Sequence, residues 1–235
     1  MLSLLTFVIF WLYFYVKVFA IIVGAGKGRR FGGLKQFIEF RGKPLIVHTA
    51  ECFEKNKLVD GIIVVVPKNM VKMTEKLLKN FNLKKIYKVV SGGKRRQDSV
   101  FNGVKVIKDR EGFVAIHDAV RPFITQRLIE RGIKLCRKYK SVIFGIPIFD
   151  TLKLVRENKV VCTVPRISPY AIQTPQFFDI KYLRAAYEKV DLNNEFTDEA
   201  GIIENAGMDV FVFKGELDNI KITTKKDLEF LKRKL

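Results

Sequence analysis

The sequence contains few of the residues from which metal centres and disulfide scaffolds are built. Its 235 residues include three cysteines, two histidines and one tryptophan. The cysteines Cys52, Cys136 and Cys162 are far apart and form no Cys-x-x-Cys pair, which excludes a zinc-binding signature and predicts reduced thiols in a cytoplasmic protein. With so few thiols and imidazoles, we expect any catalytic metal to be a hard cation held by carboxylates and phosphates.

Acidic residues are also scarce. There are 24 of them against 43 lysines and arginines, which gives a formal net charge of +19. The basic residues are spread along the whole chain, without alternation of basic and aromatic residues over one element and without a zinc-knuckle or RNP-like motif. We therefore predict no nucleic-acid partner, and interpret the charge as a lysine-rich surface that attracts small polyanions.

The pattern of apolar residues predicts a single α/β domain. Short β-branched runs without strict alternation are typical of strands that are buried on both faces, and amphipathic helical patterns lie between them. Strands that alternate with helices at this spacing predict a mostly parallel sheet. The predicted strands are Val18–Val23, Gly61–Val66, Val114–Ile116 and Val142–Pro147, and the predicted helices are Leu45–Phe53, Asn69–Asn80, Asp98–Lys108 and Gln126–Lys138.

The pattern changes after Asp150. Two short strands around Glu157-Asn158 predict a β-hairpin that projects from the sheet, as part of an arm at about residues 150–175. A loop with three prolines should follow, then two helices, a strand and a last helix that starts at Thr224. Because an isolated hairpin is marginally stable in water, we expect the arm to pack on a second subunit of a homodimer.

The strongest local signal is a glycine-rich turn directly after the first predicted strand. It is neither a Walker A loop nor a Rossmann loop, because the spacing of its glycines fits neither motif. Glycines at such a turn let backbone N–H groups approach an anion, and Arg30 and Lys35 follow closely. The turn is therefore either a phosphate-binding loop or a tight turn flanked by solvated cations; its residues are Gly24, Ala25, Gly26, Lys27 and Gly28.

A second signal is His117-Asp118-Ala119 at the end of a buried strand. Ligands of open α/β sheets bind at the carboxyl ends of the strands, where both this segment and the glycine-rich turn are expected. Asp118 is either a ligand of a magnesium ion that also binds substrate phosphates or a cap of the next helix. His117, at the edge of an apolar run, is interpreted as a packed core residue rather than a catalytic base.

Four further segments have two possible interpretations each. Gly92-Gly93 with Ser99 suits either a base- and ribose-binding site or a loop before a helix capped by Asp98 or Ser99. Asp150-Thr151 suits either a substrate contact or simply the end of a strand, and Thr197-Asp198-Glu199, which opens a helix, suits either a substrate contact or a capping sequence. Lys221 lies in an apolar stretch, where its charge requires a phosphate or a neighbouring carboxylate as partner.

In chain order, these segments resemble one family closely. The chain is similar to 2-C-methyl-D-erythritol 4-phosphate cytidylyltransferases from about Val18 to its C-terminus. The motifs that carry the resemblance are Ala25-Gly26-x-Gly28-x-Arg30, Lys35-Gln36-Phe37, Gly92-Gly93, Arg96-Gln97-Asp98-Ser99-Val100, His117-Asp118-Ala119-Val120-Arg121-Pro122, Asp150-Thr151, Arg166, Gln173-Thr174-Pro175-Gln176-Phe177, Thr197-Asp198-Glu199-Ala200 and Asp218-Asn219-Ile220-Lys221.

The resemblance implies a Rossmann-like, nucleotidyltransferase-type sheet with helices on both faces, and transfer of CMP from CTP to a sugar-alcohol phosphate. It implies that Arg30 and Lys35 stabilise the reacting α-phosphorus and that Asp118 binds Mg²⁺. The implied nucleotide site consists of Gly24, Ala25, Gly26, Lys27, Gly28, Gly92, Gly93, Ser99, Asp118 and Ala119. The implied acceptor site consists of Asp150, Thr151, Arg166, Thr197 and Lys221. In the implied homodimer, Arg166 of one subunit reaches the site of the other, and Arg166 and Lys221 place the acceptor for attack.

Two alternatives remain open at this point. A ribitol-5-phosphate cytidylyltransferase shares the glycine-rich turn and the segments around Asp118 and Lys221, although the segments around Arg96 and Thr197 match the methylerythritol group better. A membrane-tethered nucleotide-binding module without catalysis would explain the uncharged start of the chain.

That start, Met1–Val16, carries no charged residue. If Val18–Val23 is the strand before the phosphate loop, sixteen residues remain, about 24 Å as a helix against the roughly 20 residues that a bilayer requires. A basic n-region and a small-residue cleavage site are both missing, which disfavours a signal peptide. We therefore expect residues 1–17 to be an apolar extension without membrane contact and one domain to span residues 18–235. We expect translation to start at Val16 or Val18, whereas a start at Met1 would favour a membrane anchor.

Overall fold

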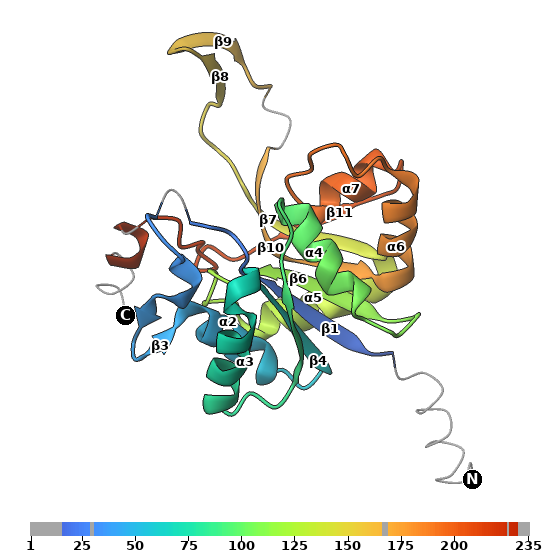
Figure 1. Cartoon of the computed structure of the whole chain (residues 1–235). Coiled ribbons are helices and arrows are strands. Elements are labelled where there is room, and N and C mark those ends of the chain that lie inside the picture. Colours follow the sequence, from blue (N-terminus) through green and yellow to red (C-terminus); the bar gives the residue numbers. More distant parts are fainter. Residues whose placement is uncertain (1–15, 29–30, 166–168, 225, 230–235) are drawn as a thin grey trace, which may run out of the picture.

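The computed structural model describes residues 16–28, 31–165, 169–224 and 226–229 (Figure 1). The described chain forms a seven-stranded sheet with the order β11-β7-β10-β6-β1-β4-β5. Every neighbouring pair is parallel except the two pairs made by β10, which is antiparallel to both β6 and β7. The strands are β1 (Val18–Val23), β4 (Gly61–Val66), β5 (Ile86–Ser91), β6 (Phe113–Asp118), β7 (Ser141–Pro147), β10 (Tyr170–Asp179) and β11 (Phe211–Lys214).

Helices cover both faces of this sheet, as the sequence predicts. In β1, Ala20 and Ile22 face one apolar core, and Phe19 and Ile21 face the other, because successive side chains of a strand point to opposite faces. The first core is closed by α2 (Leu45–Glu54), α3 (Val71–Asn80) and α5 (Gln126–Tyr139). The second is closed by α4 (Arg96–Lys105), α6 (Ile180–Lys189) and α7 (Glu199–Asn205). The chain therefore has the predicted fold class.

Two short 3-10 turns, η1 (Lys35–Phe37) and η2 (Lys68–Met70), pack on the first core. A two-stranded ribbon of β2 (Glu39–Phe40) and β3 (Lys43–Pro44) contributes Phe40 to a third, smaller apolar cluster. Near the C-terminus, residues 226–229 are helical, in agreement with the predicted last helix. Among the residues that the structure describes, no helix combines the length and the apolar character that crossing a bilayer would require.

Two strands of the seven-stranded sheet are not anticipated by the sequence pattern. The prediction of a loop around Pro169 and Pro175 is wrong, because β10 runs through this segment in the middle of the sheet. A central strand tolerates proline only where the ladder is interrupted, and the register of β10 against β7 shifts between Gln173 and Phe177. At the sheet edge, β5 has only one buried residue among six, so it lacks the apolar run that marks the other parallel strands.

The start of α4 differs from the prediction as well. The helix begins at Arg96, so Asp98 and Ser99 lie in its first turn and do not occupy the N-cap position. The Asp98 carboxylate instead accepts from the backbone N–H of Arg95, the N-cap residue, at 3.0 Å. In contrast, Asp198 is the N-cap of α7, where its carboxylate accepts from the N–H of Gly201 at 3.0 Å. A capping sequence is therefore present in the segment that starts at Thr197, and Asp198 is its capping residue.

The predicted hairpin is present and projects away from the body of the protein (Figure 1). It consists of β8 (Lys153–Arg156) and β9 (Lys159–Thr163), and both residues of the connecting turn, Glu157 and Asn158, have positive φ. Every residue of the two strands is exposed, including four large apolar side chains. These are Leu154, Val155, Val160 and Val161.

Candidate active site

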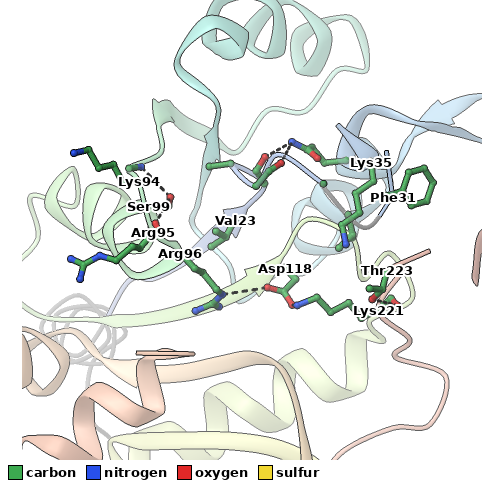
Figure 2. A pocket seen from close by; sticks show the side chains of 17 residues that line it. Val23, Phe31, Lys35, Lys94, Arg95, Arg96, Ser99, Asp118, Lys221 and Thr223 are labelled. Carbon is green, nitrogen blue, oxygen red and sulfur yellow. Dashed lines mark hydrogen bonds and ion pairs between the residues drawn. The ribbon is translucent and has the colours of Figure 1, made fainter. Parts of the chain in front are cut away.

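A cavity of about 320 Å³ opens at the carboxyl ends of β1 and β6. One wall is the glycine-rich turn after β1, from Gly24 to Gly28, and the opposite wall is the start of α4 (Figure 2). Asp118, the last residue of β6, and Lys221 from the C-terminal segment line the cavity between these walls. The two strongest sequence signals therefore meet at one end of the sheet, where open α/β folds bind their ligands.

The glycine-rich turn is held in shape by Gln36. Its side-chain amide donates to the backbone carbonyl of Gly24 at 2.6 Å and to that of Gly26 at 3.3 Å. Gly28 has φ of +62°, and a Cβ there would overlap the carbonyl of Gly33, so only glycine fits this position. A turn fixed in this way keeps its backbone close to the cavity, which suits the approach of a phosphate.

The wall formed by α4 begins with the second glycine pair. The Ser99 hydroxyl accepts from the backbone N–H of Gly93 at 3.1 Å and donates to the carbonyl of Arg95 at 3.0 Å. A Cβ on Gly92 would overlap Ala25 of the glycine-rich turn, so the two turns pack closely behind the cavity. Gly93 and Ser99 thus line the cavity directly, whereas Gly92 supports it from behind.

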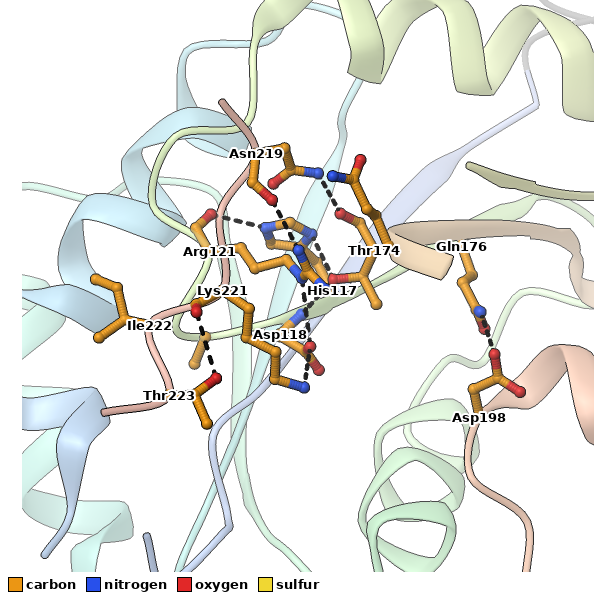
Figure 3. A network of polar contacts seen from close by, with 12 residues as sticks. His117, Asp118, Arg121, Thr174, Gln176, Asp198, Asn219, Lys221, Ile222 and Thr223 are labelled. Carbon is orange, nitrogen blue, oxygen red and sulfur yellow. Dashed lines mark hydrogen bonds and ion pairs between the residues drawn. The ribbon is translucent and has the colours of Figure 1, made fainter. Parts of the chain in front are cut away.

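Asp118 lies at the centre of a group of cations. Its carboxylate is 2.7 Å from Lys221 Nζ, 3.5 Å from Arg121 Nε and 3.7 Å from Arg96 Nε (Figures 2 and 3). Burial by itself would raise the pKa of Asp118, but the charges on Lys221, Arg96 and Arg121 outweigh burial and hold the pKa well below its usual range. The carboxylate is therefore ionised beside three cationic side chains.

His117 anchors the strand that carries Asp118. It is fully buried, and its Nε2 lies 3.0 Å from the carbonyl of Arg121, an acceptor, so Nε2 carries the proton. Its Nδ1 lies 3.1 Å from the Thr174 hydroxyl, which accepts from the Asp118 N–H at 3.0 Å (Figure 3). Burial lowers the pKa of His117 to about 4. The imidazole is neutral and structural, as the sequence predicts.

A second cavity, of about 260 Å³, adjoins the first. Both cavities have Arg96, Asp118 and Lys221 in their walls, and Thr197 and Asp198 line the second one only. Asp198 accepts from the side-chain amide of Gln176 at 2.6 Å (Figure 3). Two compartments that share a boundary of charged side chains can hold two phosphorylated molecules with their phosphates in contact.

Comparison with known proteins agrees with this geometry. The family profile of IspD, 2-C-methyl-D-erythritol 4-phosphate cytidylyltransferase, matches residues 18–233. The chain belongs to this family. Cytidylyltransferases of that name from Clostridium tetani and Dictyoglomus thermophilum are 42% and 39% identical to it, each over 90% of this chain and over 87% and 94% of the relative. The family membership predicted from the motifs is confirmed.

Solved structures of the IspD family share the fold. The 4-diphosphocytidyl-2C-methyl-D-erythritol synthase from Anaerococcus prevotii superposes with a TM-score of 0.80 at 35% identity, covering 94% of this chain and 96% of that one. The 2-C-methyl-D-erythritol 4-phosphate cytidylyltransferase from Francisella tularensis superposes with a TM-score of 0.80 at 31% identity, covering 93% and 100%. The sheet and its helices are therefore those of an IspD-type nucleotidyltransferase.

Most of the predicted nucleotide-site residues of this IspD-family chain line the first cavity. Those are Gly24, Ala25, Gly26, Gly28, Gly93, Ser99 and Asp118, together with Lys35 and Lys221. Ala119 is buried next to Gly24, and Lys27 is exposed; neither lines the cavity. Of the predicted acceptor-site residues, Thr197 and Lys221 line the second cavity.

The remaining predicted residues are placed elsewhere or are not described. Asp150 and Thr151 are exposed at the base of the arm, where Asp150 lines a third cavity of about 270 Å³, and neither lines the two joined cavities of its own chain. Arg30 and Arg166 lie outside the residues that the structure describes, as does most of the apolar extension at residues 1–17.

Several residues of the site have no role in the sequence-based prediction. They are Gln36, Arg96, Arg121, Thr174, Glu199 and Asn219. Arg121 Nη1 donates to the carbonyl of Asn219 at 2.7 Å, and the Asn219 amide donates to the carbonyl of Thr174 at 2.7 Å. All six belong to motifs of the family resemblance, so the motifs located them, but only the fold shows which atoms they hold.

The residues present can accommodate one divalent cation if the substrate supplies most of its ligands. In the described part of the chain, no three His, Cys, Asp or Glu side chains are grouped as a metal cage. Asp118 is ionised and lies on the cavity wall, so it can supply one carboxylate. A single carboxylate with phosphate oxygens and water suits Mg²⁺, which rarely takes an all-protein cage.

Proposed function

We propose that this protein transfers CMP from CTP to 2-C-methyl-D-erythritol 4-phosphate, forming 4-diphosphocytidyl-2-C-methyl-D-erythritol and pyrophosphate, a step of isoprenoid precursor biosynthesis. The observation that carries the proposal is the junction of the two cavities at Arg96, Asp118 and Lys221 in a chain of the IspD family. A nucleotide in the first cavity and a sugar-alcohol phosphate in the second would bring two phosphates together there.

The first cavity would hold CTP. The backbone N–H groups of the glycine-rich turn, residues 24–28, would bind the triphosphate, and Gly93 and Ser99 would contact the cytosine and the ribose. Lys35 would stabilise the charge that develops at the α-phosphorus; its ammonium already donates to the carbonyl of Ile222 at 2.9 Å, beside Lys221. By family resemblance, Arg30 would act with it.

The second cavity would hold the acceptor phosphate. Lys221 and Thr197 line it and would orient an acceptor phosphate oxygen toward the α-phosphorus of CTP. That oxygen forms a new bond to the α-phosphorus as the bond to the leaving pyrophosphate breaks, so no covalent enzyme intermediate is needed. The nucleophile is already ionised, and the protein contributes position and positive charge.

We propose Mg²⁺ as the cofactor, with Asp118 as its protein ligand. Bound to the triphosphate, the ion would neutralise charge on the phosphate oxygens and on the departing pyrophosphate. Asp118 is paired with Lys221 at 2.7 Å, so the same carboxylate also positions the lysine that faces both cavities.

We further propose that the protein is a cytoplasmic homodimer. Four apolar side chains on the exposed hairpin and Phe149 at its base, which is 85% exposed, indicate a surface that a second subunit covers. Arg166, Asp150 and Thr151 of one subunit would then complete the acceptor site of the other. The free thiols at Cys52, Cys136 and Cys162 are compatible with the reducing cytoplasm.

The proposal is tested by measuring pyrophosphate release by the full chain with CTP, Mg²⁺ and one acceptor at a time. We expect release with 2-C-methyl-D-erythritol 4-phosphate and much slower release with ribitol 5-phosphate. Activity with ribitol 5-phosphate alone would favour the related cytidylyltransferase, which the comparisons do not favour. Binding of CTP without release in either reaction would favour the module without catalysis. Both results would contradict the proposal.

A further inference from the structure

A buried ion pair connects the walls of the two cavities. Glu199, the first residue of α7, is fully buried, and both of its carboxylate oxygens accept from Arg96 Nη1, at 3.0 and 2.7 Å. Arg96 is the first residue of α4 and lines both cavities. The guanidinium thus lies between the carboxylates of Glu199 and Asp118. The Asp118 carboxylate is 3.7 Å from Arg96 Nε, a contact that Figure 2 draws.

The start of α4 and the segment before α7 are also joined by Arg95 and Gln97, the residues on either side of Arg96. Arg95 donates to the carbonyls of Leu192, Asn193 and Asn194 at 2.7 to 3.1 Å. The Gln97 side chain donates to the carbonyls of Leu192 and Asn194, and it accepts from the Phe196 N–H at 2.7 Å. The backbone around Glu199 is therefore held by neighbours of Arg96, so the Glu199 carboxylate is not needed to bring the two segments together.

The charge of Glu199 has a different consequence. Burial raises the pKa of Glu199, and the charge and hydrogen bonds of Arg96 oppose that rise, so the buried carboxylate is stable in its charged form only beside this close cationic partner. In return, Glu199 keeps the guanidinium from closing onto Asp118, which is already paired with Lys221 at 2.7 Å. Without the ion pair with Glu199, Arg96 would compete with Lys221 for Asp118, and both cations at the boundary of the two cavities would change position.

We propose that Glu199 is a positioning residue that holds Arg96 at the boundary of the two cavities, where the guanidinium attracts the acceptor phosphate toward the α-phosphate of the nucleotide. This inference rests on the proposed function and adds a residue pair to its acceptor site. It assigns Glu199 an effect on acceptor use and turnover rather than on CTP binding, because Gly93 and Ser99 stay fixed by their own hydrogen bonds.

The kinetic test compares Glu199→Gln with Glu204→Gln, a substitution of the same type at an exposed position of α7. We expect Glu199→Gln to lower kcat/KM for the acceptor by about 10- to 100-fold, as a displaced positioning group does, with little change in the dissociation constant of CTP. Glu204→Gln should behave as the natural chain. Equal acceptor kinetics in the two variants, or a loss confined to CTP affinity, would overturn the proposal.

A double-variant cycle separates positioning from a general structural role. If Glu199 acts through Arg96, adding Glu199→Gln to Arg96→Gln should cause no further loss of kcat/KM. A further loss comparable with that of the single Glu199→Gln variant would mean that Glu199 acts independently of Arg96, and would overturn the proposal. The free energy of unfolding, measured for each variant in urea, identifies any variant that is not folded under the assay conditions.

A spectroscopic measurement tests the positioning without turnover. A guanidinium held through one Nη by a buried carboxylate should rotate slowly, so the nitrogen NMR signals of the two Arg96 Nη atoms should be separate in the natural chain and averaged in Glu199→Gln. Averaged signals in the natural chain would overturn the proposal. If the natural chain releases no pyrophosphate with either acceptor, the proposed function fails, and this measurement still decides whether Glu199 positions Arg96.

Discussion

Asp118 shows most clearly how single residues of this protein combine stability with function. It is a nearly buried carboxylate beside Lys221, Arg121 and Arg96, at the point where the two cavities meet. Two of these cations have a second partner: Arg121 donates to the carbonyl of Asn219, and Arg96 forms an ion pair with Glu199. One carboxylate therefore orders the positive charges that the proposed reaction needs.

Replacing Asp118 by Asn should destabilise the protein at neutral pH by about 3 kcal/mol, because it leaves partly buried cations without their partner. The folded-state pKa of Asp118 is lowered, so its contribution is present above the pKa of about 4 of an unfolded aspartate and is lost as pH falls through the folded-state pKa. Urea unfolding should show the difference between the two chains shrinking from pH 7 to pH 3. A difference that stays constant or grows would contradict this electrostatic account.

Replacing Lys35 by Gln should lower kcat about 100-fold while changing the affinity for CTP far less, because its charge is assigned to the transition state. Turnover is measured by pyrophosphate release and CTP affinity by calorimetry. Lys134→Gln, at an exposed position of α5, is the control and should change neither quantity. Losses of similar size in turnover and affinity would place Lys35 in ground-state binding instead.

At the residue scale, the sequence predicted many of the residues that line the two cavities but not the contacts between them. Lys35, Asp118 and Lys221 are recognisable because charged residues follow a glycine-rich turn or interrupt apolar segments. Arg96 is one of three consecutive cations with Lys94 and Arg95, all of which line the first cavity, and nothing in this run indicates that only Arg96 also lines the second. That distinction depends on where α4 begins, and boundaries of helices are poorly determined by sequence patterns.

At the scale of elements, the glycine-rich turn depends on one backbone conformation. Gly28 has positive φ, and its carbonyl accepts from the N–H groups of Phe31 and Gly32, both at 2.9 Å. Gln36, in η1, holds the same turn from the other side. The shape of the proposed phosphate-binding turn thus results from its contacts with the residues that follow it, up to Gln36 of η1.

Gly28→Ala should therefore weaken CTP binding and reduce the free energy of unfolding. A left-handed conformation costs an L-residue about 1 to 2 kcal/mol, and the loss should be larger here because the Cβ would also overlap the Gly33 carbonyl. The matched control is Gly207→Ala after α7, where φ is +69° and a Cβ meets no atom within 4 Å. The control should lose stability by the conformational cost alone and bind CTP normally. Unfolding in urea and CTP titration distinguish them; normal CTP affinity in Gly28→Ala would contradict the role of the turn.

Elements with their own apolar pattern were predictable, and those defined by their neighbours were not. The strands β1, β4 and β7 are β-branched and buried, and the patterns of α2, α3 and α5 repeat on one face. In contrast, β10 contains Pro175 and polar residues such as Gln173, and its place between β6 and β7 results from pairing with both. Only tertiary contacts reveal such a strand.

At the scale of the whole molecule, the arm is the part that the fold of one chain does not explain. Its hairpin has no buried residue, although a two-stranded hairpin is marginal alone, and Figure 1 shows it well away from the sheet. The predicted homodimer would cover its apolar side chains and bring Arg166 to the site of the other subunit.

Leu154→Lys should shift the protein from dimer to monomer, because it places a charge in the apolar surface of the arm. The matched control is Leu58→Lys on the body, since Leu58 is 43% exposed and Leu154 is 56% exposed. Sedimentation velocity over a range of concentrations should show monomer for the arm variant and dimer for the control. A Leu154→Lys chain that stays dimeric, or a natural chain that is monomeric, would contradict the assignment of the dimer contact to the arm.

The central claim is that position and charge at the junction of two cavities suffice for direct transfer of the nucleotide. It is tested most directly with a single diastereomer of CTP that carries sulfur on the α-phosphate, by determining the configuration at that phosphorus in the product. One in-line attack by the acceptor phosphate predicts inversion. Retention would require two successive displacements through a covalent enzyme intermediate and would contradict the account.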